Sequence, residues 1–291
     1  MIPSLPRPPW LRAATALYVC AFLGFLFLPL IVVAIFAFND APYPAPPWRG
    51  FTLDWFLGNQ THGRVGLFGD GELLGSLWTS CIVAAWVTLL SVGLGTCNAF
   101  LIERGRFVGK QALSILMLAP LVIPGVILGI SILAFASRVA EFAEDAFGLE
   151  WDFLRPGLPL VVLGQFSFIA TIATLTISAR LRRFDCTLEE AALNLGASKT
   201  AVLRTILLPY LRPALLGSAA ISFLMSFADF NTTLMLVGAD APLTVMMYGR
   251  MREGASPVLN AVSLFLMIAS AALALALMRG GAARSKAANS A

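Results

Sequence analysis

Six long apolar segments constrain this chain more than any other feature. Five of them contain no charged residue, and the remaining one, 213–238, contains a single charged residue, Asp229. The segments are 13–38, 73–102, 111–137, 156–179, 213–238 and 254–278. A helix needs about 20 mostly apolar residues to cross a bilayer, whereas a barrel strand alternates in polarity over about ten. We therefore predict an all-α integral membrane protein with six transmembrane helices.

Composition agrees with this prediction and narrows the function classes. The chain is 58% hydrophobic and only 12% charged, whereas soluble domains carry about 25% charged residues. It has one histidine and four cysteines, and their spacing does not predict a metal site or a disulfide framework. The first apolar segment is longer than the roughly 7–15 residues of a signal peptide, so we interpret it as a retained span.

The distribution of basic residues chooses the orientation. With the amino terminus inside, the inner segments hold 14 of the 20 Lys and Arg residues. The positive-inside rule then places both termini in the cytoplasm. The net charge of +4 belongs to the inner face of a membrane protein and is no argument for nucleic-acid binding. We expect one transmembrane domain, 1–291, with a single long cytoplasmic loop at 180–212.

That loop has the pattern of two short helices joined at a glycine. Thr187 and Glu190 have capping-box spacing, and Gly196 can end the first helix in a left-handed conformation. Ser198 can cap a second helix, which we expect Pro209 to break before the fifth span. Periodicity and charge leave two interpretations open: helices lying on anionic lipid, or helices docking on a protein.

The alanine pair in this loop favours docking, because small side chains permit close approach of a partner. The loop also resembles the EAA loop of ABC-importer permease subunits, whose pattern is E-A-A, three residues, G, nine residues, I, one residue, L-P. The matching residues are Glu190, Ala191, Ala192, Gly196, Ile206, Leu208 and Pro209. Two further segments, 36–56 and 248–263, resemble spermidine/putrescine permeases of the second-permease subgroup.

The resemblance implies a mechanism and a set of partners. In that family the loop forms a coupling helix that inserts into a groove on the ATPase subunit. The first four matching residues would dock, and the last three would shape the return to the membrane. This chain has no G-x-x-x-x-G-K-[ST] loop, so ABC ATPase partners would bind and hydrolyse the ATP. A second homologous permease and an extracytoplasmic binding protein would complete a bacterial inner-membrane importer without a cofactor or enzyme activity in this chain.

The substrate path is less defined by the sequence. Asp229 is the one acid within a span, and such a residue is a functional candidate by default. Asn231 and Thr232 follow it, and we group the three as substrate-pathway candidates. The competing interpretation places Asp229 near the outer end of its span, hydrated or paired with an arginine of the partner permease. Polyamine permeases often have two adjacent acids here, so an amino-acid-like or neutral substrate stays open.

Two other function classes remain as rivals. An intramembrane enzyme would need converging His, Asp or Ser groups at membrane depth. An ATP-independent secondary transporter would favour repeat symmetry and several polar spans, and it would leave the EAA-like loop unexplained. Gly125 and Gly129 form a G-x-x-x-G pair beside Pro120 and Pro124, for which we expect close helix packing first and a hinge at the prolines second.

Overall fold

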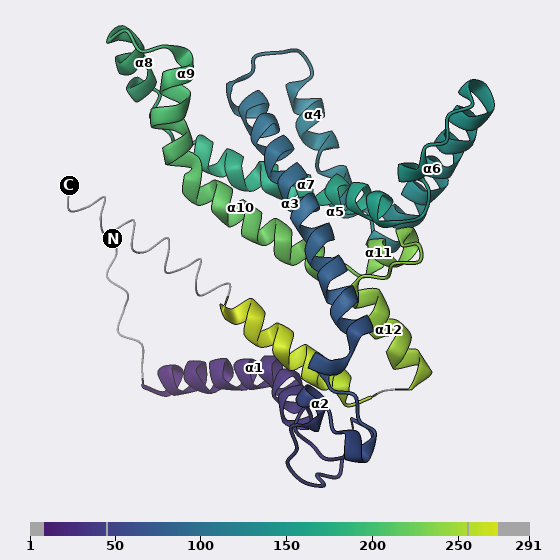
Figure 1. Cartoon of the computed structure of the whole chain (residues 1–291). Coiled ribbons are helices and arrows are strands. Elements are labelled where there is room, and N and C mark those ends of the chain that lie inside the picture. Colours follow the sequence, from purple (N-terminus) through teal and green to yellow (C-terminus); the bar gives the residue numbers. More distant parts are fainter. Residues whose placement is uncertain (1–8, 45, 255, 273–291) are drawn as a thin grey trace. The chain divides into compact units, whose positions relative to one another are not determined.

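The structure is a computed structural model that describes residues 9–44, 46–254 and 256–272. Within these residues the chain is helical, and its extended segments form only two isolated β-bridges. The helices, labelled in Figure 1, are α1 Pro9–Phe36, α2 Asp54–Leu57, α3 Gly71–Arg104, α4 Lys110–Leu116, α5 Ala119–Val122, α6 Gly125–Phe147, α7 Leu158–Leu181, α8 Thr187–Asn194, α9 Lys199–Val202, α10 Leu208–Ala228, α11 Asn231–Leu236 and α12 Leu243–Glu253. A π-helical turn, Leu203–Leu207, joins α9 to α10.

Five helices in the described residues are long and apolar enough to cross a membrane. They are α1, α3, α6, α7 and the continuous helix Lys199–Ala228. For the sixth predicted span, 254–278, the structure describes an apolar helix over Val258–Ala272. Residues 273–278 of that span lie outside the described residues. The predicted all-α membrane fold is confirmed.

The described residues belong to two compact units. The smaller unit, 1–71 with 250–269, contains α1 and the loop that follows it. The indole Nε1 of Trp55 donates to the carbonyl oxygen of Asn39 over 2.8 Å, and Arg64 Nη1 bonds to Asp40 and Asp54 over 2.6 and 3.2 Å. These bonds hold an otherwise irregular, proline-rich segment in one conformation.

The larger unit, 72–249 with 270–291, contains most of the apolar core. Buried residues of α3, α6, α7 and α11 form one cluster: Val83, Val87, Ala136, Leu160, Val161, Ile169 and Leu236. α7 lies at its centre and packs along α10 on another side. A second cluster, Leu181, Phe184, Leu207 and Leu211, joins the end of α7 to the start of α10.

Gly95 permits the close approach of α3 and α7. A Cβ atom at this position would lie 2.8 Å from the Cβ of Ala173 and 3.0 Å from the backbone nitrogen of Thr174. We expect Gly95→Val to destabilise the folded chain by about 1–3 kcal/mol, because overpacking displaces backbone. Unfolding in detergent micelles would measure the loss. Gly93→Val is the matched control, since the space beside Gly93 is open; equal stability of the two variants would contradict this packing.

The third apolar segment differs from its prediction. We expected one helix over 111–137, and the structure has α4, α5 and α6 in its place, with α6 continuing to Phe147. Ile123 has an extended ψ of 128° because the following Pro124 disfavours the helical conformation at the preceding residue. The proline-rich stretch therefore ends one helix and starts another.

The fifth apolar segment also differs. The prediction that Pro209 breaks the helix is wrong, because Lys199–Ala228 is continuous. Pro209 lies in the first turn of α10, directly after the wider π-helical turn, where a missing N–H is tolerated. The helix then ends at Ala228 rather than at 238, because Asp229 leaves the helical region with ψ 123°.

Candidate functional site

The first candidate site is the α8 tip, residues 185–198, between α7 and α9. The Oδ1 atom of Asp185 accepts hydrogen bonds from the Thr187 backbone N–H over 3.0 Å and from its hydroxyl over 2.8 Å. These bonds lower the pKa of the Asp185 carboxyl. The predicted helix start is confirmed, but the predicted capping box is wrong. Thr187 is the first helical residue, and the preceding Cys186 makes no side-chain cap.

The end of α8 follows the sequence prediction. Gly196 has φ +87°, and its N–H bonds to the carbonyl of Leu193 over 3.0 Å. The Ala197 N–H bonds to the carbonyl of Ala192 over 3.0 Å, which completes a Schellman motif. Ser198 Oγ then accepts from the Ala201 N–H over 3.2 Å and caps α9, as predicted. The reversal of the chain at Gly196 is therefore fixed by backbone bonds.

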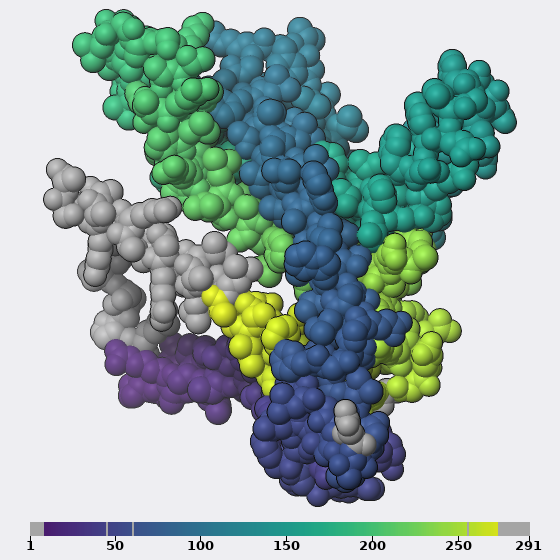
Figure 2. All heavy atoms as spheres, in the orientation of Figure 1, coloured from purple at the N-terminus to yellow at the C-terminus, as the bar shows by residue number. Residues whose placement is uncertain are grey.

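The α8 tip presents an apolar surface next to an acid. Glu190, Ala191 and Gly196 are exposed, and Ala192 is half-buried. The leucines of the tip, Leu188, Leu193 and Leu195, are also exposed, Leu195 to 89%. Figure 2 shows α8 and α9, in green, at the far end of the helix that continues into α10. The sequence patterns did not single out these leucines as a surface, although several leucines in one short loop helix were an available signal.

The base of the tip is packed. Ile206 lies against the second cluster, Leu208 is half-buried and Pro209 is exposed. The guanidinium of Arg180 lies 4.1 Å from the ring centroid of Tyr210, whose hydroxyl donates to the Arg180 carbonyl over 3.3 Å. The end of α7 and the start of α10 are thus joined directly beneath α8.

An ion pair links α8 to the end of α3. Arg104 Nη1 and Nη2 donate to the two carboxylate oxygens of Glu189 over 3.0 and 2.7 Å. We call this contact the α3–α8 ion pair. Arg182 Nε donates to Glu103 over 2.8 Å and connects α3 to the residue after α7. The sequence pattern missed both pairs, because their partners lie about 80 positions apart.

The second candidate site is the break between α10 and α11. The Oδ2 atom of Asp229 accepts from the Thr233 N–H over 3.0 Å and from the Thr233 hydroxyl over 2.9 Å. Its carbonyl oxygen accepts from the Thr244 hydroxyl over 3.0 Å. The half-buried carboxylate therefore fixes the start of α11, a role compatible with either interpretation of Asp229 given above.

A buried glutamine extends this hydrogen-bond network into α7. Gln165 Nε2 donates to Thr233 Oγ1 over 2.8 Å, and its Oε1 accepts from the Ser226 hydroxyl. Gln165 is only 1% exposed. Such a buried polar side chain is stable only where its amide finds both kinds of partner. Our sequence reasoning missed Gln165, although a lone amide in an apolar span was a usable signal.

The other two pathway candidates differ in exposure. Asn231 is exposed, whereas Thr232 is fully buried beside Gly125 and Gly164. A Cβ on Gly129 would lie 2.9 Å from the Cβ of Met235, so the G-x-x-x-G pair packs against α11. The predicted close packing of this pair is confirmed, and Thr232 contributes to it.

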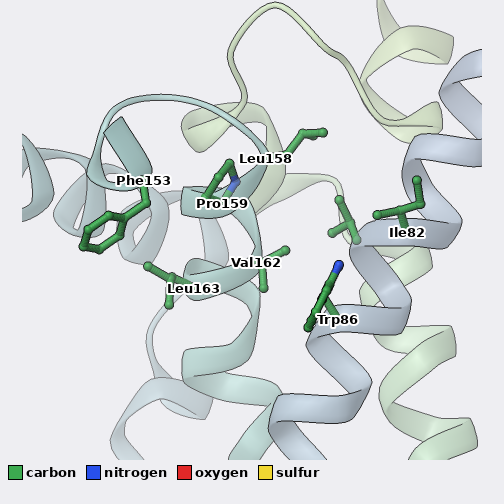
Figure 3. Close-up of a pocket in the computed structure, with 8 residues that line it drawn as sticks. Ile82, Trp86, Phe153, Leu158, Pro159, Val162 and Leu163 are labelled. Carbon is green, nitrogen blue, oxygen red and sulfur yellow. The ribbon is translucent and has the colours of Figure 1, made fainter. Parts of the chain in front are cut away.

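A third region is an apolar pocket between α3 and the start of α7. Ile82 and Trp86 project from α3 towards Leu158, Pro159, Val162 and Leu163, as Figure 3 shows. Its volume is 390 Å³. These side chains offer no acid, base or metal ligand. Within the described residues, groups of three or more His, Cys, Asp or Glu side chains that could hold a metal do not occur.

Comparisons with known proteins agree on one class. Residues 91–283 match the family described as "Binding-protein-dependent transport system inner membrane component". The chain is 29% identical to the putrescine transport system permease protein PotI of Escherichia coli K12, over 90% of this chain and 86% of the relative. It is 27% identical to the spermidine/putrescine permease PotC of Haemophilus influenzae, over 86% and 89%.

The solved structures show the same fold. A bacterial alginate ABC transporter in complex with its pentasaccharide-bound periplasmic protein contains a similar chain. The TM-score is 0.72 at 19% identity, covering 92% of each chain. A second crystal structure of an alginate importer gives a TM-score of 0.69 at 19% identity, covering 93% of this chain and 94% of the other.

Proposed function

Because this chain belongs to the family of binding-protein-dependent transport system inner membrane components, we propose that it is the membrane-spanning permease subunit of an ATP-driven ABC importer. The chain is a multi-pass membrane protein, and its relatives are transport permeases. The proposal treats 1–291 as one permease domain. It assigns transport, rather than catalysis, to this subunit.

The observation that carries the proposal is the α8 tip. It exposes three leucines and Glu190 on a turn whose geometry is fixed by the Schellman motif and the Ser198 cap. An exposed apolar knob on a rigid turn suits insertion into a partner's groove. In the proposed complex, Glu190, Ala191, Ala192 and Gly196 dock on the ATPase. Ile206, Leu208 and Pro209 belong to the helix that carries the movement into the membrane.

The proposal includes an orientation and partners. The excess of Lys and Arg favours both termini in the cytoplasm of a bacterium, with α8 on the same side. Two ABC ATPase subunits bind the ATP, since this chain has no phosphate-binding loop motif, and the chain itself takes no cofactor. A second homologous permease completes the membrane channel, and an extracytoplasmic binding protein delivers the substrate.

We assign the substrate to the polyamines, because the relatives PotI and PotC are named as putrescine and spermidine/putrescine transport permeases. Asp229 is the acid that would meet the cation, with Asn231 and Thr232 beside it. Its carboxylate accepts two hydrogen bonds from Thr233, and the exposed side chain of Asn231 is the neighbouring polar group open to cargo. A single acid also suits an amino-acid-like or neutral solute, which is the alternative substrate class.

The decisive experiment reconstitutes the full importer in liposomes with its binding protein. ATPase stimulation and uptake are measured with putrescine, spermidine, amino acids and neutral solutes. We expect stimulation by a polyamine. Stimulation only by another solute would keep the permease assignment and contradict the polyamine one. Uptake without any ATPase subunit would instead favour a secondary transporter.

The same preparation tests the substrate role of Asp229 through Asp229→Asn. The amide retains an oxygen for the Thr233 bonds, so we expect the fold to persist while cation uptake falls about tenfold or more. Thr233→Ser is the control, since it keeps the hydroxyl that bonds to Asp229. Unchanged polyamine uptake by a folded Asp229→Asn variant would leave Asp229 with a capping role alone.

A further inference from the structure

Two neighbouring cavities lie at the end of the larger unit that carries α8. The outer cavity, of 570 Å³, is lined by Glu103, Lys110, Gln111, Ser114 and Arg182 among others. The inner cavity, of 220 Å³, reaches down between the residues after α4 and the inner part of α7. Ile102, Ser114 and Arg182 line both cavities, so the two adjoin at these residues.

The outer cavity has a net positive charge. Lys110 Nζ donates to the carbonyl of Gly105 over 3.2 Å and has two further donors. Arg182 bonds to Glu103 through Nε, and its two Nη groups carry further donors. The two cations and Glu103 together leave one positive charge, which matches a single phosphodiester. Ser114 and Gln111 add polar groups to the same rim.

The inner cavity is mainly apolar with one hydroxyl in need of a partner. Met117, Leu118 and Leu175 supply the apolar lining. Ser178 is 5% exposed, and within the described residues its Oγ has no hydrogen-bond partner. Thr174, which lines the same cavity, satisfies its own hydroxyl through the Ala170 carbonyl over 2.8 Å. A buried hydroxyl of this kind favours a ligand with an acceptor at this depth.

We infer that the two cavities form one binding site for an anionic phospholipid. The phosphate lies between Lys110 and Arg182, an ester carbonyl accepts from the Ser178 hydroxyl, and an acyl chain lies against Met117, Leu118 and Leu175. A free phosphate would contact the cations of the outer cavity but leave the apolar inner cavity empty. A hydrocarbon would fill the inner cavity but make no ion pair with Lys110 or Arg182. In the orientation proposed above, the site belongs to the cytoplasmic leaflet. The inference concerns lipid binding and does not depend on which solute the chain transports.

The test measures bound lipid directly by native mass spectrometry of the detergent-purified importer. Phosphatidylglycerol and phosphatidylcholine are added in separate titrations. We expect the wild-type chain to retain phosphatidylglycerol preferentially. In the variant Lys110→Gln/Arg182→Gln, bound phosphatidylglycerol should fall to the level of phosphatidylcholine. The matched control is Arg106→Gln/Arg183→Gln, which removes two exposed charges from the same end but does not alter a residue lining either cavity.

A second variant, Ser178→Leu, fills the inner cavity without changing any charge. We expect it to lose phosphatidylglycerol as well, which a purely electrostatic surface would not do. Equal lipid loss in the control that alters Arg106 and Arg183 would overturn the inference, because binding would then be unspecific. Inorganic phosphate that displaces the lipid at matched concentration would also overturn it, in favour of a soluble-anion site. Full lipid retention by a folded Ser178→Leu variant would exclude the inner cavity.

Discussion

Glu190→Lys should abolish ATP-driven uptake while the chain still inserts into the membrane. Glu190 is exposed on the first turn of α8, where an acid interacts favourably with the helix dipole by about 0.3–1 kcal/mol. That loss is too small to unfold the loop. If the groove on the ATPase is complementary to this acid, a lysine there brings like charges together, which costs several kcal/mol of binding free energy. The ATPase should therefore bind at least about thirtyfold more weakly.

Uptake into liposomes and co-purification of the ATPase subunit check this prediction together. Glu150→Lys is the matched control, because it reverses an exposed acid that precedes α7, at the opposite end of that helix from α8. We expect the control to transport at the rate of the wild-type chain. Normal uptake by a well-expressed Glu190→Lys variant would contradict the docking role of the α8 tip.

Arg104→Glu should uncouple transport from ATP hydrolysis. It replaces the bidentate α3–α8 ion pair with a repulsive contact, because the introduced carboxylate faces Glu189. Partly exposed ion pairs contribute only about 0–1 kcal/mol to stability, so the fold should persist. The mechanical link between the coupling loop and α3 should be lost. We expect uptake per ATP hydrolysed to fall about tenfold, a factor within the usual range of coupling between two sites.

The double variant Arg104→Glu/Glu189→Arg tests the link itself. It restores opposite charges across the same contact and should recover much of the coupling. Arg155→Glu is the control. It disrupts another ion pair, between Arg155 and Glu144, whose two side chains are half-exposed and which does not involve α8. Coupling ratios of the variants, with thermal unfolding alongside, distinguish the mechanism. A single variant with an unchanged ratio would show that α3 moves independently of this ion pair.

Local patterns predicted the elements of this protein well. Charge-free runs of about 20 residues or more identified the spans, because a bilayer sets both their length and their polarity. Gly196 and Ser198 identified the two ends of the turn, because each acts through bonds to residues only a few positions away. The family resemblance of the EAA-like loop needed nothing beyond spacing along the chain.

Boundaries within spans were predicted less well. Pro209 breaks a helix in most contexts, but a π-helical turn before it lets Lys199–Ala228 continue. Pro124 and Asp229 end helices that the apolar pattern extended across them. Hydropathy indicates whether a segment is apolar enough to lie in the membrane. It carries little information on where the backbone leaves the helical conformation within that segment.

The sequence by itself determined the membrane class, the helical fold and the position of the α8 tip. Only the tertiary structure decided that Gln165 bonds to Thr233, that Arg104 bonds to Glu189, and that the leucines of the tip are exposed. The physical reason is distance along the chain. Capping, periodicity and hydropathy act between near neighbours, whereas these contacts join helices 68 and 85 positions apart and exist only once the helices pack.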